Sequence, residues 1–266
     1  MHIVSLAHRQ LGTAGSGRSS PLLLLHGLLG SSRNWQTSGR LLWERHSVYV
    51  PDLRNHGESP HAREMDYPSL AADVLGWMDR EGIGKAHIVG HSMGGKVAMY
   101  LACRYKERFS SLTVVDIACR AYPPRWEKEF AVMQAMPVQS FTRRLEAEEW
   151  LEKDIRDWAF RKFLVSNLDR NPAGGFRWIV NLDILQAALP NLFQQVPAEG
   201  QSWEGPVLFL RGEQSRFFLD EDLAMGRRFF PAATLQTIAD AGHNVHFDQP
   251  AAFVEAVLEH VGKAEG

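Results

Sequence analysis

The segment around Ser92 constrains the fold of this chain more than any other feature. An apolar run at 86–89 leads into Gly90-His91-Ser92-Met93-Gly94, and apolar side chains then recur at helical spacing as far as Cys103. This order predicts a short buried strand, a sharp turn and a helix. The two glycines lack a Cβ, so a tight turn fits beside its neighbours. The turn would raise the Ser92 hydroxyl above the sheet and aim the Met93 N–H at the same place.

The same alternation of apolar runs and helical stretches extends along most of the chain. The four leucines at 22–25 form a continuous apolar run, which is typical of a strand buried on both faces. Residues 11–20 form a Gly/Ser turn region. The alternation predicts an α/β fold with a mostly parallel, helix-covered sheet. The predicted strands are 3–8, 22–25, 46–50, 86–89, 111–115, 207–210 and 234–238. The predicted helices are one that ends at 41–43, then 70–80, 94–103 and 251–261.

Residues 120–202 interrupt this pattern. They show no strand pattern, and proline-containing segments separate amphipathic helical stretches at 126–136, 144–167 and 176–189. One sheet domain with a helical insertion explains this order most economically. We therefore expect a core of residues 1–119 and 203–266, and a helical cap subdomain of residues 120–202.

Composition excludes several classes of protein. The 266 residues carry a formal net charge of −2, with 45% hydrophobic and 23% charged residues, which is typical of a globular protein without a nucleic-acid or anionic-membrane partner. No apolar run approaches the roughly 18 residues that span a bilayer, and the first residues do not resemble a signal peptide. Cys103 and Cys119 would then remain reduced. We expect a cytoplasmic monomer or weak homo-oligomer.

Polar motifs follow the predicted strands at the edge where parallel sheets bind ligands. The motifs are His26-Gly27-Leu28, Asp52-Leu53-Arg54-Asn55-His56-Gly57-Glu58-Ser59, Ser92, Asp116, Arg211-Gly212-Glu213 and Gly242-His243-Asn244. Taken in order, they resemble the α/β-hydrolase superfamily with a helical cap. Within it, residues 26–35, 52–57 and 176–182 are similar to the small acyl-ester hydrolases of the YbfF and ABHD11 type. The resemblance implies a serine esterase that acts on small to medium acyl esters or thioesters without a cofactor.

The residues and the resemblance together assign the candidate catalytic groups. A G-x-S-x-G turn between a strand and a helix is typical of a serine nucleophile, here Ser92. His243 follows a glycine in the loop after the last strand and is the candidate base, with His246 as its nearest competitor. Each histidine has a structural alternative, because histidine is often half-buried. By carry-over from the family, the backbone N–H groups of Leu28 and Met93 would form the oxyanion hole.

The acid departs from the usual superfamily pattern. Ser215 stands where most members carry an aspartate after the strand that returns from the cap. Asp116 instead ends the strand after the nucleophile helix, and the YbfF-like group resembles this chain in that departure. We therefore take Asp116 as the acid and Ser215 as an accessory hydrogen-bond partner; a strand-end carboxylate without a catalytic role remains the alternative. Other carboxylates nearby are out of register: Glu213, Asp220 and Asp222.

Two other functions stay open. One is a different reaction on the same fold, such as C–C bond hydrolysis or a cofactor-free elimination. The other is a ligand-binding protein of this fold without catalysis. A haloalkane dehalogenase is disfavoured because it needs a carboxylate at position 92. No metal is expected, since His243, His246 and Asp248 lack a second cluster of ligands. Four cap tryptophans either shape an acyl pocket or pack the subdomain core: Trp126, Trp150, Trp158 and Trp178.

Overall fold

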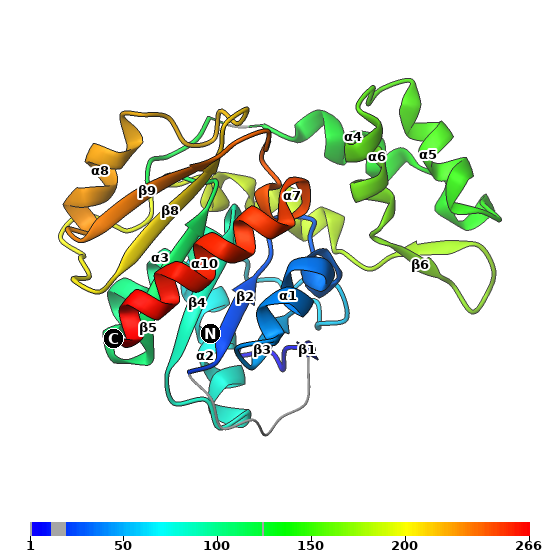
Figure 1. Cartoon of the computed structure of the whole chain (residues 1–266). Helices are drawn as coiled ribbons and strands as arrows, with labels where there is room; N and C mark the ends of the chain where they lie inside the picture. Colours follow the sequence, from blue (N-terminus) through cyan, green and yellow to red (C-terminus); the bar gives the residue numbers. More distant parts are fainter. Residues whose placement is uncertain (1, 12–19, 124) are drawn as a thin grey trace.

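A mostly parallel sheet forms the centre of the molecule (Figure 1). The computed structural model describes residues 2–11, 20–123 and 125–266. Within these ranges the main sheet has seven strands in the order β1-β3-β2-β4-β5-β8-β9. Only β1 runs antiparallel to its neighbour, so the predicted α/β fold class is confirmed. The strands are β1 (His8–Leu11), β2 (Leu22–Leu25), β3 (Val48–Pro51), β4 (Ala86–His91), β5 (Phe109–Val115), β8 (Val207–Gly212) and β9 (Ala233–Ile238).

Helices cover both faces of this sheet, which explains the unbroken run of leucines in β2. Leu22 and Leu24 pack in one apolar cluster with residues of α1 (Gln36–Trp43) and α10 (Pro250–Glu265). Leu23 and Leu25 pack in the other cluster with α2 (Tyr67–Arg80) and α3 (Met93–Arg104). Burial of one leucine side chain contributes about 1.5–3 kcal/mol to the free energy of folding. Alternate leucines of β2 therefore stabilise the packing of the helices on opposite faces of the sheet. None of the helices in the described ranges is long and apolar enough to cross a membrane.

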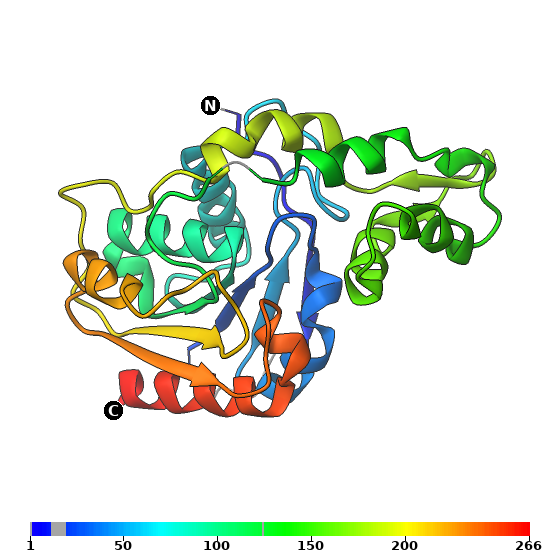
Figure 2. The same ribbon diagram turned by 90° about the horizontal axis from the view of Figure 1, so that it is seen from above.

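The segment between β5 and β8 extends beyond the edge of the sheet, and Figures 1 and 2 show α7 connecting it to the rest. Its elements are α4 (Glu127–Ala135), a 3-10 turn (Val138–Ser140), α5 (Arg144–Glu152), α6 (Trp158–Val165), β6 (Leu168–Arg170), β7 (Phe176–Trp178) and α7 (Leu182–Leu192). Between β8 and β9 lies α8 (Asp222–Phe229), and a short helix α9 (Val245–Asp248) precedes α10.

The expectation that this segment contains no strands is wrong. β6 and β7 form an antiparallel hairpin, and Gly174 and Gly175 supply positive φ angles of 105° and 68° in its turn. Each strand has three residues, too few to show an alternating pattern. The stretch 144–167 is also two helices, α5 and α6, rather than one.

The first predicted strand is misplaced. Val4 and Leu6 are buried, which produces an alternating pattern, but two backbone N–H groups there donate to side chains. The Val4 N–H donates to Asp73 Oδ1 at 2.8 Å, and the Ala7 N–H donates to Ser59 Oγ at 2.9 Å. The ladder therefore begins only at β1. Most of the predicted turn at 11–20 lies outside the described residues.

Candidate active site

Ser92 lies in a tight turn between β4 and α3. Its φ of 52° and ψ of −117° fall outside the regions that residues with side chains usually adopt. A Cβ on Gly90 would lie 2.2 Å from the carbonyl oxygen of Gly94, and one on Gly94 would lie 2.4 Å from that of Leu25. The N–H of Ser92 donates to the Val115 carbonyl of the adjacent strand at 3.0 Å. The turn therefore depends on both glycines, as the sequence predicts.

Asp116 immediately follows β5, the strand beside that of Ser92. Its side chain is fully buried, and its carboxylate accepts three hydrogen bonds. Oδ2 accepts from Nδ1 of His243 at 2.7 Å and from the Ser215 hydroxyl, while Oδ1 accepts from the Gly212 N–H at 3.0 Å. These donors satisfy the buried carboxylate. The structure thus brings together the expected base, acid and accessory serine.

The alternative carboxylates do not reach His243. All of them lie near the ends of β8 and α8, and each has another partner. Glu213 accepts from the Asp240 N–H at 3.2 Å, Asp220 pairs with Arg211 at 2.7 Å, and Asp222 pairs with Arg120 at 3.0 Å. These pairings favour Asp116 as the acid.

Two aromatic rings fix the position of His243. The Phe217 ring stacks on the His243 ring, with centroids 3.8 Å apart and planes inclined by 23°. The second ring is that of His91, whose Nε2 donates to the His243 backbone carbonyl at 2.9 Å. The sequence does not reveal the role of Phe217, because nothing in the spacing of residues after β8 indicates which side chain turns back to the loop.

His246 occupies a different environment. It is buried and stacks on Trp35 with ring centroids 4.1 Å apart. Its other close ring neighbours are His91 and Phe253. Burial lowers the pKa of His246 to about 3, so the ring stays neutral at neutral pH. These contacts indicate a packing role rather than that of the base.

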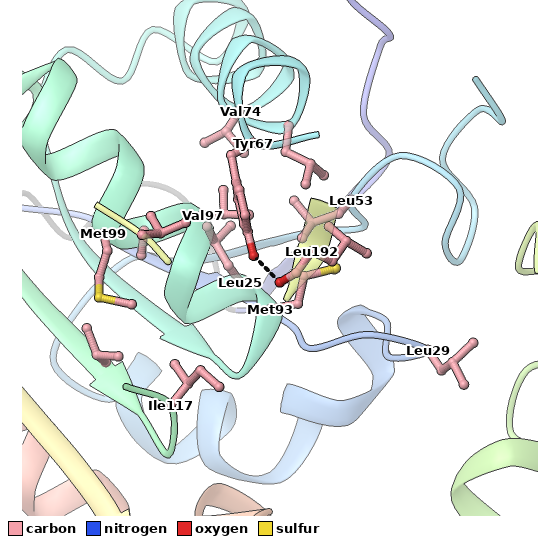
Figure 3. Packing of buried hydrophobic residues seen from close by; sticks show 14 of the residues in the cluster. Leu25, Leu29, Leu53, Tyr67, Val74, Met93, Val97, Met99, Ile117 and Leu192 are labelled. Atoms are coloured by element: carbon pink, nitrogen blue, oxygen red, sulfur yellow. Dashed lines mark hydrogen bonds between the residues drawn. The ribbon is translucent and has the colours of Figure 1, made fainter. Parts of the chain in front are cut away.

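The loop that carries Leu28 lies directly against the Ser92 turn. A Cβ on Gly27 would lie 3.2 Å from Cβ of Ser92, so the loop backbone lies close to the Ser92 side chain. Met93 is the first residue of α3, so its N–H has no intrahelical acceptor. Its side chain is buried beside Leu25 (Figure 3). Both candidate oxyanion donors thus sit on well-packed backbone next to Ser92.

Two buried histidines hold this loop in shape. Nε2 of His26 accepts the Leu53 N–H at 2.9 Å, and Nε2 of His56 accepts the Leu29 N–H at 3.1 Å. In each ring Nδ1 then carries the proton and donates to a backbone carbonyl. Burial lowers the pKa of both side chains, that of His56 to about 3. The two rings therefore act as neutral bridges between loop 26–30 and the loop after β3.

Comparison with known proteins decides the family. A family model described as alpha/beta hydrolase fold matches residues 20–250. The chain belongs to the alpha/beta hydrolase fold family. The sn-1-specific diacylglycerol lipase ABHD11 of Xenopus laevis is 37% identical over 259 residues, which cover 94% of this chain and 82% of that protein. Esterase YbfF of Escherichia coli is 32% identical, covering 91% of this chain and 93% of its own length.

A solved structure gives the same result. A marine microorganism esterase superposes with a TM-score of 0.92 at 34% identity, covering 97% of this chain and 99% of its own. These relatives confirm the resemblance to YbfF-type and ABHD11-type esterases. As a member of the alpha/beta hydrolase fold family with such relatives, the chain is a carboxylic ester hydrolase.

A side chain of the segment inserted into this hydrolase fold forms a hydrogen bond with the candidate oxyanion loop. The buried Asn167 donates its amide N–H to the Leu29 carbonyl at 2.8 Å. Its own backbone carbonyl accepts the Ile179 N–H at 2.9 Å. Asn167 follows α6 without any motif around it, so sequence reasoning missed it.

The tryptophans of the segment do not all behave alike. Trp126 packs against Phe160 with ring centroids 5.4 Å apart, and Trp150 packs against Phe141 at 6.5 Å. Trp178 is partly buried against the same apolar cluster. Trp158 differs, because 59% of it is exposed, so a packing role does not account for this residue.

The structure gives no support for the metal cluster considered around His243. No group of three or more potential ligands lies together in residues 2–11, 20–123 and 125–266. Asp248 accepts the Gly242 N–H at 2.9 Å and so holds the loop of His243.

The buried histidines predict the acid stability of the protein. Burial lowers the pKa of His26, His56, His91 and His246, so below about pH 6.5 the unfolded chain binds protons that the folded chain does not. The free energy of unfolding should therefore fall as the pH decreases, by up to roughly 1.4 kcal/mol per pH unit for each histidine that stays neutral in the folded chain, as His56 and His246 do with pKa values of about 3. Urea unfolding between about pH 7 and pH 5 measures this slope.

A substitution isolates one contribution to that slope. His56→Gln should reduce the slope of the free energy of unfolding against pH by about the contribution of one histidine. This holds whether or not the substitution changes the stability at neutral pH. A free energy of unfolding that stays constant from neutral pH to about pH 5 would contradict the neutral state of these rings.

Proposed function

We propose that this protein hydrolyses small to medium acyl esters or thioesters through an acyl-enzyme formed on Ser92. The bond from His243 Nδ1 to the Asp116 carboxylate, 2.7 Å long, carries the proposal. It leaves Nε2 as the ring nitrogen that can accept a proton. Because Asp116 ends the strand beside that of Ser92, this base and the nucleophile belong to one edge of the sheet.

The proposed reaction follows from these positions. His243 removes the proton of Ser92 as its oxygen attacks the acyl carbonyl, and the N–H groups of Leu28 and Met93 stabilise the negative oxygen. The C–O or C–S bond then breaks, and the imidazolium gives its proton to the leaving alcohol or thiol. Water activated by His243 attacks the acyl-enzyme and releases the carboxylic acid. Asp116 keeps the ring oriented and stabilises its charge, with Ser215 as its accessory donor.

We assign the substrate-shaping role to residues 120–202 as a cap on a core of residues 1–119 and 203–266. The contact from Asn167 to the Leu29 carbonyl supports this division, because it joins the inserted segment to the loop of the proposed oxyanion hole. The names of the relatives, an esterase and a diacylglycerol lipase, support acyl esters as the substrate class. No cofactor takes part in the proposed steps.

We further propose that the protein works as a monomer or weak homo-oligomer in the cytoplasm. Its two cysteines, Cys103 and Cys119, are buried free thiols. Burial raises the pKa of each to about 12. Such thiols are poor nucleophiles for disulfide exchange, in keeping with a reducing compartment.

A panel of p-nitrophenyl esters and acyl-CoA thioesters of increasing chain length tests the function. The wild-type protein should hydrolyse part of this panel, and the profile of kcat/KM defines its acyl chain and its preference between ester and thioester. His243→Ala should lose roughly 10⁴-fold or more in kcat. His246→Ala is the matched control and should keep most of the activity. Equal losses, or the reverse order, would contradict His243 as the base.

A further inference from the structure

A buried lysine lies one turn beyond the proposed nucleophile. The Lys96 N–H donates to the Ser92 carbonyl at 3.1 Å, and Lys96 is 1% exposed. Its ammonium group donates to the Arg120 carbonyl at 2.8 Å and to the Gln194 carbonyl. In the part of the chain that the structure describes, no carboxylate pairs with it. Burial of a cation without a counter-charge is costly, and the hydrogen bonds to these two backbone carbonyls offset part of that cost.

The two carbonyls belong to the segments that lead into and out of the inserted region. These segments bond to each other: the Tyr122 N–H donates to the Phe193 carbonyl at 2.8 Å, and the Val196 N–H donates to that of Cys119 at 2.9 Å. Lys96 therefore bridges 119–122 and 193–196 at the centre of their pairing. We call this arrangement the hinge.

The hinge also contacts the loop that supports His243. The Tyr122 hydroxyl accepts the Ala118 N–H at 2.8 Å and donates to the Phe217 carbonyl. Nζ of Lys96 lies 5.1 Å from the centre of the Tyr122 ring. Phe217 in turn stacks on His243. An unbroken series of contacts thus runs from Lys96 to the proposed base.

A further contact fixes the outgoing segment. The Tyr67 hydroxyl of α2 donates to the Leu192 carbonyl, at the end of α7 (Figure 3). This bond anchors α7 to the core at the residue before Phe193, whose carbonyl accepts the Tyr122 N–H. The contacts of Lys96 and Tyr122 join the hinge to the loop of His243.

We infer that Lys96 is a positioning residue for ester hydrolysis: its amino group holds the two segments of the hinge together and thereby keeps Phe217 stacked on His243. The inference rests on the proposed function of Ser92 and His243. Lys96 touches neither substrate nor the reacting atoms. It acts through Tyr122 and Phe217 on the orientation of the histidine ring.

The donors of Lys96 remain sufficient when its charge changes. Burial is the main cause that lowers the pKa of Lys96 to about 7, and the smaller effects of Cys119, which raises it, and Arg120, which lowers it, are included in that value. The protonated group has three N–H donors and the neutral amine has two. Two carbonyls can therefore be bonded in either state, so the hinge depends on the presence of the amino group rather than on its charge.

Lys96→Met tests this inference because it keeps the length and apolar stem of the side chain and removes every donor. At a temperature well below its unfolding midpoint, kcat for a good p-nitrophenyl ester should fall by roughly tenfold or more, with a smaller change in KM. Lys96→Arg restores donors and should recover part of kcat. Lys106→Met, an exposed lysine beyond α3, is the control and should match the wild type.

Tyr122→Phe provides a second test that does not alter the lysine. It removes only the hydroxyl that joins Ala118 to Phe217, and it should lower kcat in the same direction. In a double-mutant cycle, Lys96→Met and Tyr122→Phe should be less than additive in kcat, since both act on Phe217.

The outcomes separate this inference from the proposed function. A wild-type protein without esterase activity would overturn the proposed function. An active wild type, with Lys96→Met equal to it in kcat, would overturn the positioning role alone. The positioning role would also be overturned if Lys96→Met changes only the unfolding midpoint, or if the two variants are fully additive.

Discussion

Ser92→Ala is expected to lower kcat for ester hydrolysis by roughly 10⁴ to 10⁶, the cost of removing a triad nucleophile, while the protein stays folded. Within the described ranges the Ser92 hydroxyl makes no hydrogen bond, so its loss should change the free energy of unfolding by less than about 1 kcal/mol. The strained turn is retained, because alanine has the same Cβ. Steady-state kinetics and urea unfolding measure the two quantities.

A cysteine at the same position provides a chemical control. Ser92→Cys keeps a nucleophilic atom on the turn, so it should form an acyl-enzyme with activated esters, whereas Ser92→Ala should not. Residual turnover by the Ser92→Ala protein within about tenfold of the wild type would show that another group attacks the ester.

Asp116→Asn is expected to lower kcat by up to about 10⁴, and the structure explains why. The Gly212 N–H faces Oδ1 at 3.0 Å, so the amide carbonyl would keep that position. The amide NH₂ would then face Nδ1 of His243 and donate to it. The ring proton would move to Nε2, the atom that must accept the proton of Ser92. The fold should survive, since the change is isosteric.

Ser215→Ala is the matched comparison. It removes one of three donors to the same carboxylate and should lower kcat by about tenfold. A change of this size corresponds to the free energy of about one hydrogen bond. Combining Asp116→Asn with Ser215→Asp should recover part of the activity, because Ser215 Oγ already lies at the oxygen that His243 contacts. An Asp116→Asn protein near wild-type activity, with Glu213→Gln or Asp220→Asn inactive, would instead locate the acid after β8.

Much of the fold is predictable from local pattern. The continuous apolar strands are predictable because burial on both faces requires an apolar residue at each position. The turn at Ser92 is predictable because the close approach of backbone requires glycine at positions 90 and 94. The predicted strand ends differ from β3, β4 and β8 by only a few residues. Proximity of Asp116 to Ser92 was also predictable, since consecutive strands of such a sheet are often neighbours.

Other features depend on contacts between distant residues. The hairpin of β6 and β7 is too short to show a period, and the Val4 N–H donates to a side chain, that of Asp73, instead of to a neighbouring strand. The residues next to Lys96 and Phe217 in the sequence do not indicate which distant groups these two side chains contact. For these positions only the tertiary structure reveals the contacts with the hinge and with His243.

The central claim is that Ser92 becomes acylated with His243 as its base, and covalent labelling tests it most directly. The wild-type protein is treated with a fluorophosphonate, digested, and its peptides are mapped by mass spectrometry. We expect a single adduct on Ser92, much slower labelling of His243→Ala, and normal labelling of His246→Ala. An adduct at another residue, or an active protein that resists the reagent, would contradict the claim.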